Sequence, residues 1–257
     1  MLTQRLGLMG VIAILPAFAQ VSIAPRLNSA IRGLVDHNDG TVTTENWSGY
    51  AVTGSDFTKA EGSWIVPAVT CTSGTEYAVF WVGIDGYSSK TVEQTGTEAV
   101  CSGTTATYSA WYEFCCTEPI ITIPSITVQP GDKMTASIVY SSTTGKFTVK
   151  ITDERTGATF SKSAKVAGAK RSSAEWIAEA PSSGIILPLA DYGTVLFGKD
   201  NTSIAGTCNA TDSTTSGHIG AFSTIEEITM EKNSIMESIP SALSSDGTSF
   251  SVTWAAQ

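Results

Sequence analysis

Apolar and polar residues alternate with a period of two along most of the chain after Asn46. The segment 133–140 carries an apolar or aromatic residue at every second position, and 146–152 repeats the pattern. Successive side chains of a strand point to opposite faces of a sheet, so each segment predicts a strand with one buried face. The Ser-Ser-Thr-Thr-Gly sequence between the two segments predicts a short hairpin loop.

Shorter patterns of the same kind predict further strands at Trp47–Val52, Ser63–Val66, Glu76–Asp85, Thr107–Phe114, Ile120–Val128, Ser173–Glu179, Thr194–Phe197, Ile225–Met230 and Ser249–Trp254. Many strands spaced by roughly 8–12 residues, with turn residues between them, are typical of a β-sandwich or barrel. No segment predicts a helix longer than two turns, and neither a repeat nor a linker divides the region. We therefore predict one all-β domain.

The first residues have the pattern of a secretory signal peptide. A single positive charge at Arg5 precedes the apolar run Leu6–Ala17, and small residues at Ala17 and Ala19 suit signal peptidase. A membrane anchor is the alternative, but the run is shorter than the ~20 residues of a bilayer span and Pro16 interrupts it. We expect residues 1–19 to be removed and the mature protein to be secreted, extracellular and away from the membrane.

The next segment, residues 20–45, has a different character. It contains Arg26, Arg32 and His37 and shows no strand alternation. It is either an unstructured N-terminus or a propeptide whose positive charge lies against an acidic body, since the chain as a whole has a net charge of −9. We expect a propeptide that inhibits the protein until it is removed, with a boundary near Glu45 that the sequence leaves open.

The composition limits the possible binding partners of the protein and the pH at which it is expected to work. Only 15% of residues are charged, whereas soluble domains usually contain about 25%. Because the chain has few carboxylates, it loses little stability when acid protonates them, which suits a protein that works at low pH. An acidic body without a basic stripe argues against nucleic acid as a partner. We expect a monomer without cofactors.

Five cysteines and three glycosylation sequons fit a secreted chain. We expect one or two disulfides without assigning them among Cys71, Cys101, Cys115, Cys116 and Cys208. The sequons begin at Asn46, Asn201 and Asn209, and each could carry a glycan in a host that glycosylates.

Several kinds of catalytic site are excluded by missing residues. After the N-terminal segment the only histidine is His218, in a loop rich in Ser, Thr and Gly, so a Ser-His-Asp or Cys-His site has no evident base. No group of His, Cys and carboxylate residues has the spacing of a zinc site, and no phosphate-binding glycine loop is present. Carboxyl and carboxamide groups remain as candidates, with no metal.

Those groups occur on strands beside large apolar residues. Alternation predicts that some of these residues share one face of their strand: Trp81 with Asp85, Trp111 with Glu113, Val92 with Gln94, and Glu175 with Ile177 and Glu179. The side chains of Glu93 and Trp176 should point to the opposite face of their strands. A carboxyl buried beside an indole has a raised pKa and can serve as a general acid. A solvated outer face would explain each residue singly, but explains the repeated Trp partners less well.

Five motifs then occur in order: Asn46-Trp47-Ser48-Gly49, Trp81-Val82-Gly83-Ile84-Asp85-Gly86, Gln94-Thr95-Gly96, Ala110-Trp111-Tyr112-Glu113 and Ala174-Glu175-Trp176-Ile177-Ala178-Glu179. From about Asn46 to the C-terminus the chain resembles the glutamic peptidases, or eqolisins. The resemblance implies an antiparallel β-sandwich of two packed sheets, a concanavalin A/lectin-like jelly roll, over residues 46–257. It also implies a substrate groove on the concave sheet.

By position, Gln94 matches the family's catalytic Gln and Glu175 its catalytic Glu. The groove residues that surround or orient this pair match Trp47, Trp81, Asp85, Trp111 and Glu113. Glu98 stands where the resemblance leads us to expect Asp, so its supporting role is less certain. Glu179 shares the face of Glu175, and only the motif favours Glu175 over it.

The resemblance implies an acid endopeptidase, insensitive to pepstatin, that hydrolyses unfolded polypeptides through a water held between Glu175 and Gln94. Two other functions fit a sandwich with Trp residues in a groove. One is a lectin-like carbohydrate-binding module. The other is a glycoside hydrolase that uses paired carboxylates, with Glu175 and Glu113 as the pair.

Overall fold

Strands make up most of the computed structural model, which describes residues 30–115 and 119–255. The predicted signal peptide and Cys116 lie outside these residues. Eighteen strands form one hydrogen-bonded sheet, and β13 (Ser182–Ser183) pairs with β14 (Ile185–Ile186) separately. Helix in the described part is limited to α1 (Lys199–Thr202) and a 3-10 turn at Ile219–Ala221, as the sequence predicts. Of these helices, none has the length or apolar character needed to cross a bilayer.

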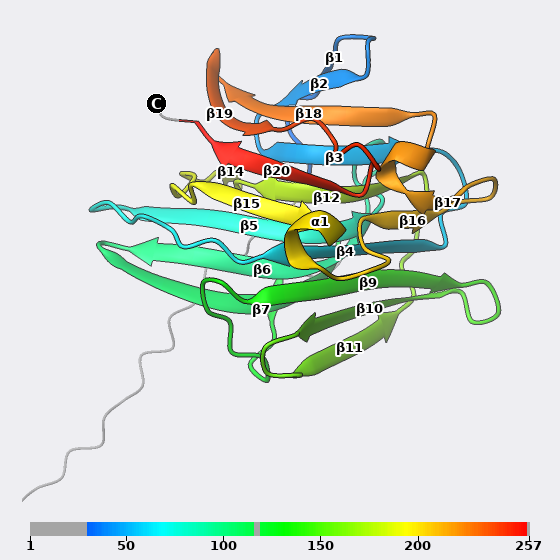
Figure 1. The fold of residues 1–257 in the computed structure, drawn as a ribbon, viewed down its shortest axis with the longest axis horizontal. Coiled ribbons are helices and arrows are strands. Elements are labelled where there is room, and N and C mark those ends of the chain that lie inside the picture. Colours follow the sequence, from blue (N-terminus) through cyan, green and yellow to red (C-terminus); the bar gives the residue numbers. More distant parts are fainter. Residues whose placement is uncertain (1–29, 116–118, 256–257) are drawn as a thin grey trace, which may run out of the picture.

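The long sheet folds into two layers that pack face to face (Figure 1). The first layer contains, in spatial order, β2 (Thr41–Thr44), β18 (Ile225–Lys232), β3 (Trp47–Thr53), β12 (Ser173–Glu179), β5 (Thr75–Ile84), β6 (Val92–Ser102) and β7 (Thr105–Cys115). The second contains β19 (Ile235–Pro240), β20 (Ser249–Trp254), β15 (Thr194–Gly198), β4 (Lys59–Ile65), β9 (Lys133–Ser141), β10 (Lys146–Asp153) and β11 (Thr159–Ala164). The predicted β-sandwich is confirmed.

Short strands complete the two layers. β1 (Val35–Asp36) pairs with β2, β8 (Ile121–Thr122) pairs with β7, and β16 (Asn209–Thr211) lies between β4 and β17 (Ser216–His218). The β18–β19 hairpin joins the layers at one edge, and a bulge between Met230 and Glu231 bends it there.

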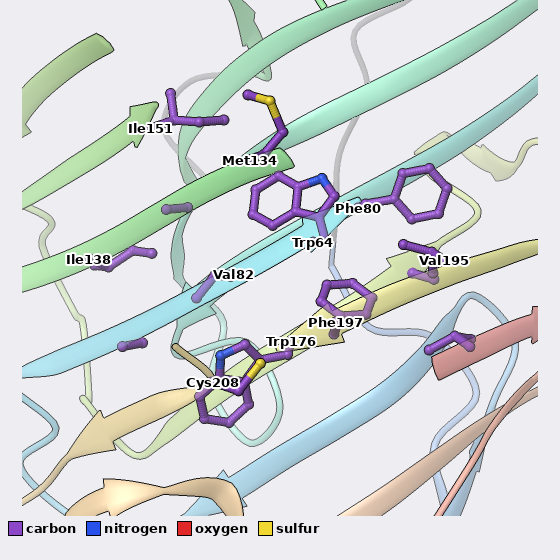
Figure 2. Packing of buried hydrophobic residues seen from close by; sticks show 14 of the residues in the cluster. Trp64, Phe80, Val82, Met134, Ile138, Ile151, Trp176, Val195, Phe197 and Cys208 are labelled. Atoms are coloured by element: carbon purple, nitrogen blue, oxygen red, sulfur yellow. The ribbon is translucent and has the colours of Figure 1, made fainter. Parts of the chain in front are cut away.

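The main core lies between the layers (Figure 2). Trp64 and Phe197 from the second layer pack toward Phe80, Val82 and Trp176 from the first, and all five are buried. The Trp176 indole donates a hydrogen bond of 2.8 Å to the Glu61 backbone carbonyl, which satisfies its one polar atom in the core. Burying side chains of this size contributes roughly 2–3 kcal/mol each and fixes the orientation of the first layer.

A second apolar cluster covers the other face of the first layer. Its members include Trp47, Trp81, Trp111 and Ile177, all fully buried. They alternate along their strands with residues of the main core, so the period of two places them on the opposite face. This face carries the polar residues that the sequence analysis selected.

Every predicted strand overlaps an observed one, and the bounds differ clearly in two places. β4 begins at Lys59, four residues before the predicted start, because residues 59–62 pair with β9. Only Ile121–Thr122 of the predicted strand Ile120–Val128 is a strand, since Pro124 has no N–H with which to continue a ladder. The predicted strands lack β6, although alternation was assigned to Val92 and Gln94 there, and they also lack β11, β16, β17 and β19.

The expectation of no strands before Asn46 is wrong. β2 joins the first layer by parallel pairing with β18, and Val42 and Thr44 of β2 are buried. The end of the predicted propeptide segment is therefore part of the sheet in this chain.

One disulfide joins Cys71 to Cys101, within the expected number. Cys115 is also disulfide-bonded. Cys208 is a buried free thiol.

Candidate active site

Four strands of the first layer place Glu175, Gln94 and Glu113 in one row across the sheet. The register pairs Glu175 of β12 with Gly83 of β5, Gly83 with Gln94 of β6, and Gln94 with Glu113 of β7. Neighbouring strands lie about 4.8 Å apart, so Glu175 and Gln94 flank Gly83 with Cα atoms about 10 Å apart. All three polar residues are buried on the face of the tryptophan cluster.

Gly83 has a steric role in this row. A Cβ atom at this position would lie 2.8 Å from Cζ3 of Trp81 and 3.3 Å from Cγ2 of Val92. The Trp81 ring thus occupies the space above Gly83, between the strands that carry Glu175 and Gln94. Any larger residue at position 83 would displace the indole.

The Glu175 carboxyl is fully buried. Among the described residues, nothing donates to either of its oxygens. Burial raises the pKa of Glu175 well above its ordinary value, and the nearby charges of Asp85 and Glu93 raise it further. The Ser173 hydroxyl and the Tyr87 backbone N–H lie close enough to oppose this shift but not in the geometry of a hydrogen bond. In this conformation the carboxyl is an acid rather than a base.

Gln94 is oriented by its neighbour in the row. Its Nε2 donates a 2.7 Å hydrogen bond to Oε2 of Glu113, and its Oε1 has no partner among the described residues. Because an amide nitrogen carries two hydrogens, the contact with Glu113 leaves one N–H for another acceptor. Glu113 therefore determines which end of the carboxamide is the nitrogen.

The second carboxyl of β12, Glu179, has a different environment. Its Oε2 accepts a 2.7 Å hydrogen bond from the Trp81 indole, and Trp81 packs edge to face against Trp47 with ring centroids 4.8 Å apart. Glu179 thus orients the indole that lies over Gly83. This contact separates the roles of two residues that the sequence places on the same face.

Asp85 anchors the end of β5 to the start of β12. Its carboxylate accepts hydrogen bonds from the backbone N–H groups of Lys170, Arg171 and Ser172, at 2.7, 2.7 and 2.9 Å. Asp85 itself has a φ of 70°, which turns the chain sharply after the strand. The residue positions the strand that carries Glu175.

Among the predicted supporting residues, only Glu113 lies in the row itself, whereas Glu98 lies farther along β6. It pairs with Val79 and Ser109, and it lies four residues along β6 from Gln94, about 13 Å away. Its Oε1 accepts a 2.7 Å hydrogen bond from the Ser109 hydroxyl, and burial raises its pKa. Trp111 lies between, in the next row, paired with Gly96.

Comparison with known proteins decides the family. The model of the peptidase A4 family matches residues 45–254. Aspergillopepsin-2 of Aspergillus niger is 30% identical over 203 residues, which is 68% of this chain and 72% of that protein. Scytalidopepsin B of Scytalidium lignicola is 32% identical over 149 residues, 56% of this chain and 55% of that protein.

The chain belongs to the peptidase A4 family. A crystal structure of scytalido-glutamic peptidase with a transition state analog inhibitor has the same fold, with a TM-score of 0.67 at 24% identity over 82% of this chain and 98% of that one. The protein is therefore a hydrolase of peptide bonds, and the carbohydrate-binding and glycosidase alternatives are set aside.

The row of this A4 peptidase is closed to solvent. Loop 85–91 and residues 30–36 lie side by side near it and together line two pockets, of about 200 and 640 Å³. Ile31 packs against the tryptophan cluster, and the Asn46 carboxamide holds the backbone on either side of it, at Ala30 and Arg32.

The predicted charge contact between this segment and the body can be checked for Arg32 and His37, because Arg26 lies outside the described residues. Among residues 30–115 and 119–255, neither Arg32 nor His37 takes part in a salt bridge. The segment is held instead by β pairing, by Asn46 and by apolar contact.

The sequence analysis did not select Glu93 as a site residue. Glu93 lies on the core side of β6, opposite Gln94, and is fully buried without a hydrogen-bond partner among the described residues. Burial, reinforced by the charge of Asp85, raises its pKa to about 9. Alternation already turned it toward the core, which was the available signal. In the described part of the chain, no three His, Cys, Asp or Glu side chains form a group that would hold a metal.

Proposed function

We propose that this A4 peptidase is a secreted acid endopeptidase in which Glu175 and Gln94 activate one water molecule. The observation that carries the proposal is the unpartnered Glu175 carboxyl, in one row with a carboxamide that Glu113 orients. A buried acid without protein partners costs stability and is retained where function needs it.

The chemistry follows from the two groups. Glu175, as the carboxylate, takes a proton from a water molecule as that water attacks the peptide carbonyl. The free N–H of Gln94 donates to the oxyanion that develops on the carbonyl oxygen. Protonated Glu175 then transfers the proton to the leaving amine, so one carboxyl performs both transfers.

These proton transfers require a groove that is open to water and substrate. While Glu175 is buried its pKa lies too high for it to ionise at acid pH. Removal of residues 30–36 would admit water to the row, reduce the desolvation and lower that pKa. The described conformation therefore fits an inactive precursor, with the segment before Asn46 as its inhibitor.

The proposed substrates are unfolded polypeptides, because an extended strand suits a groove across a sheet. The test uses denatured casein at pH 2–5 and, separately, soluble polysaccharides. We expect peptide release that neither pepstatin, a metal chelator nor serine and cysteine reagents reduce, and no sugar release. Strong inhibition by the chelator or by pepstatin would overturn the proposed mechanism.

A further inference from the structure

The three glycosylation sequons stand in very different environments. N-linked glycosylation replaces one hydrogen of the Asn side-chain amide with a sugar. A sequon can therefore carry a glycan in the folded protein only where that nitrogen is free of internal hydrogen bonds and has an open path to solvent. The environments of Asn46, Asn201 and Asn209 separate them on these criteria.

Asn46 fails both criteria. It is 0% exposed, its Nδ2 donates to the Ala30 carbonyl at 3.0 Å, and its Oδ1 accepts from the Arg32 N–H at 2.8 Å. A sugar on Nδ2 would have to replace the chain segment that Asn46 holds.

Asn201 uses its amide nitrogen completely. Its Nδ2 donates to the backbone carbonyls of Phe197 at 2.7 Å and Phe250 at 3.1 Å, which tie α1 to β15 and β20. The amide has only two hydrogens, so conjugation would break one of these bonds. The following residue, Thr202, is itself buried.

Asn209 meets both criteria. It is the first residue of β16, it is half-buried, and no hydrogen bond to its side chain is formed by the described residues. Its neighbour Ala210 is buried in the core, so alternation points Asn209 outward. On the paired strand β4 the same outer face carries the partly exposed Lys59–Glu61 ion pair.

We propose that Asn209, alone among the three sequons, is an N-glycosylation site of the folded protein. The Asn209 Nδ2–C1 glycosidic bond forms as the bond from C1 to phosphate breaks in a lipid-linked oligosaccharide diphosphate. The amide proton leaves with the lipid diphosphate. The glycan projects from the outer face of the second layer, whereas Glu175 lies on the far face of the first, so it does not obstruct the groove.

The inference rests on the proposed secretion, and the experiment separates the two. The full chain is expressed in yeast with its own leader, and a second version carries a yeast leader in place of residues 1–19. Glycopeptides of the secreted protein are mapped after enzymatic deglycosylation in heavy-oxygen water, which marks each occupied Asn. We expect at least tenfold higher occupancy at Asn209 than at Asn46 or Asn201.

Matched variants locate the modification without altering the site residues. Asn209→Gln and Thr211→Ala should abolish the glycan, Thr211→Ser should keep it, and Ser203→Ala should leave the total unchanged. Removing the glycan should change kcat/KM by less than twofold. If only the version with the yeast leader appears in the medium, the result counts against the proposed secretion. Secreted protein that is unmodified at Asn209, or modified at Asn201 or Asn46, would overturn this inference.

Discussion

Replacement of Glu93 by Gln should stabilise the protein at neutral pH and leave it unchanged at acid pH. Glu93 is buried on the core side of β6, and the charge of Asp85 reinforces the effect of its burial. A neutral isostere keeps the shape of the side chain but cannot ionise. The variant therefore isolates the cost of burying this acid.

The magnitude follows from the pKa. In the unfolded chain Glu93 ionises at its ordinary value of 4.5, whereas in the folded protein its pKa is about 9. Between these values the folded state binds more protons than the unfolded state, so stability falls as pH rises from 4.5 toward 9. At about 1.36 kcal/mol per unit, the loss at pH 7 is about 3 kcal/mol, and below pH 4.5 there is none.

The assay is urea unfolding at pH 4 and pH 7, with Glu154→Gln as the matched control because Glu154 is exposed. We expect Glu93→Gln to raise the free energy of unfolding by about 3 kcal/mol at pH 7 and by less than about 1 kcal/mol at pH 4. In a domain of this size that equals roughly 6–12 °C in Tm at pH 7. An equal gain at both pH values, or none at pH 7, would refute the reasoning.

Two further predictions test the row and its covering. Gly83→Ala should displace the Trp81 ring, destabilise the protein by about 1–3 kcal/mol and reduce kcat/KM at least tenfold; normal activity would show that the indole position is unimportant. Purified precursor should shorten on acidification to a form that starts near Thr41–Glu45. We expect cleavage close to Thr41, because residues 33–41 are exposed. The Glu175→Gln precursor should not shorten, and its processing at the normal rate would exclude self-cleavage.

Period-two alternation predicted the strands that carry the site because those strands alternate between two buried faces. β12 was predicted with its observed bounds, and the split of Trp176 from Glu175 and Glu179 holds in the structure. In contrast, β1 and β2 are short and polar, and β2 owes its pairing to β18, nearly 190 residues away. No local pattern encodes such a partner.

The separation of Glu175 from Glu179 also required the fold. Both residues lie on one face of one strand between apolar neighbours, so their sequence environments are nearly the same. They differ in a contact with another strand, the hydrogen bond from Trp81 to Glu179. Glu93 shows the reverse case, because alternation predicted its face correctly but not its complete burial.

The most direct test of the catalytic assignment is to measure kcat of variants at positions 175, 94 and 179 on a fluorogenic peptide at acid pH. Circular dichroism checks that each variant is folded. Glu175→Gln removes the proton acceptor and Gln94→Ala the oxyanion donor, so each should lower kcat by about 10²–10³ or more. Glu179→Gln can still accept the Trp81 hydrogen bond and should cost less than about tenfold. A dead Glu179→Gln enzyme beside a nearly normal Glu175→Gln enzyme would contradict the account.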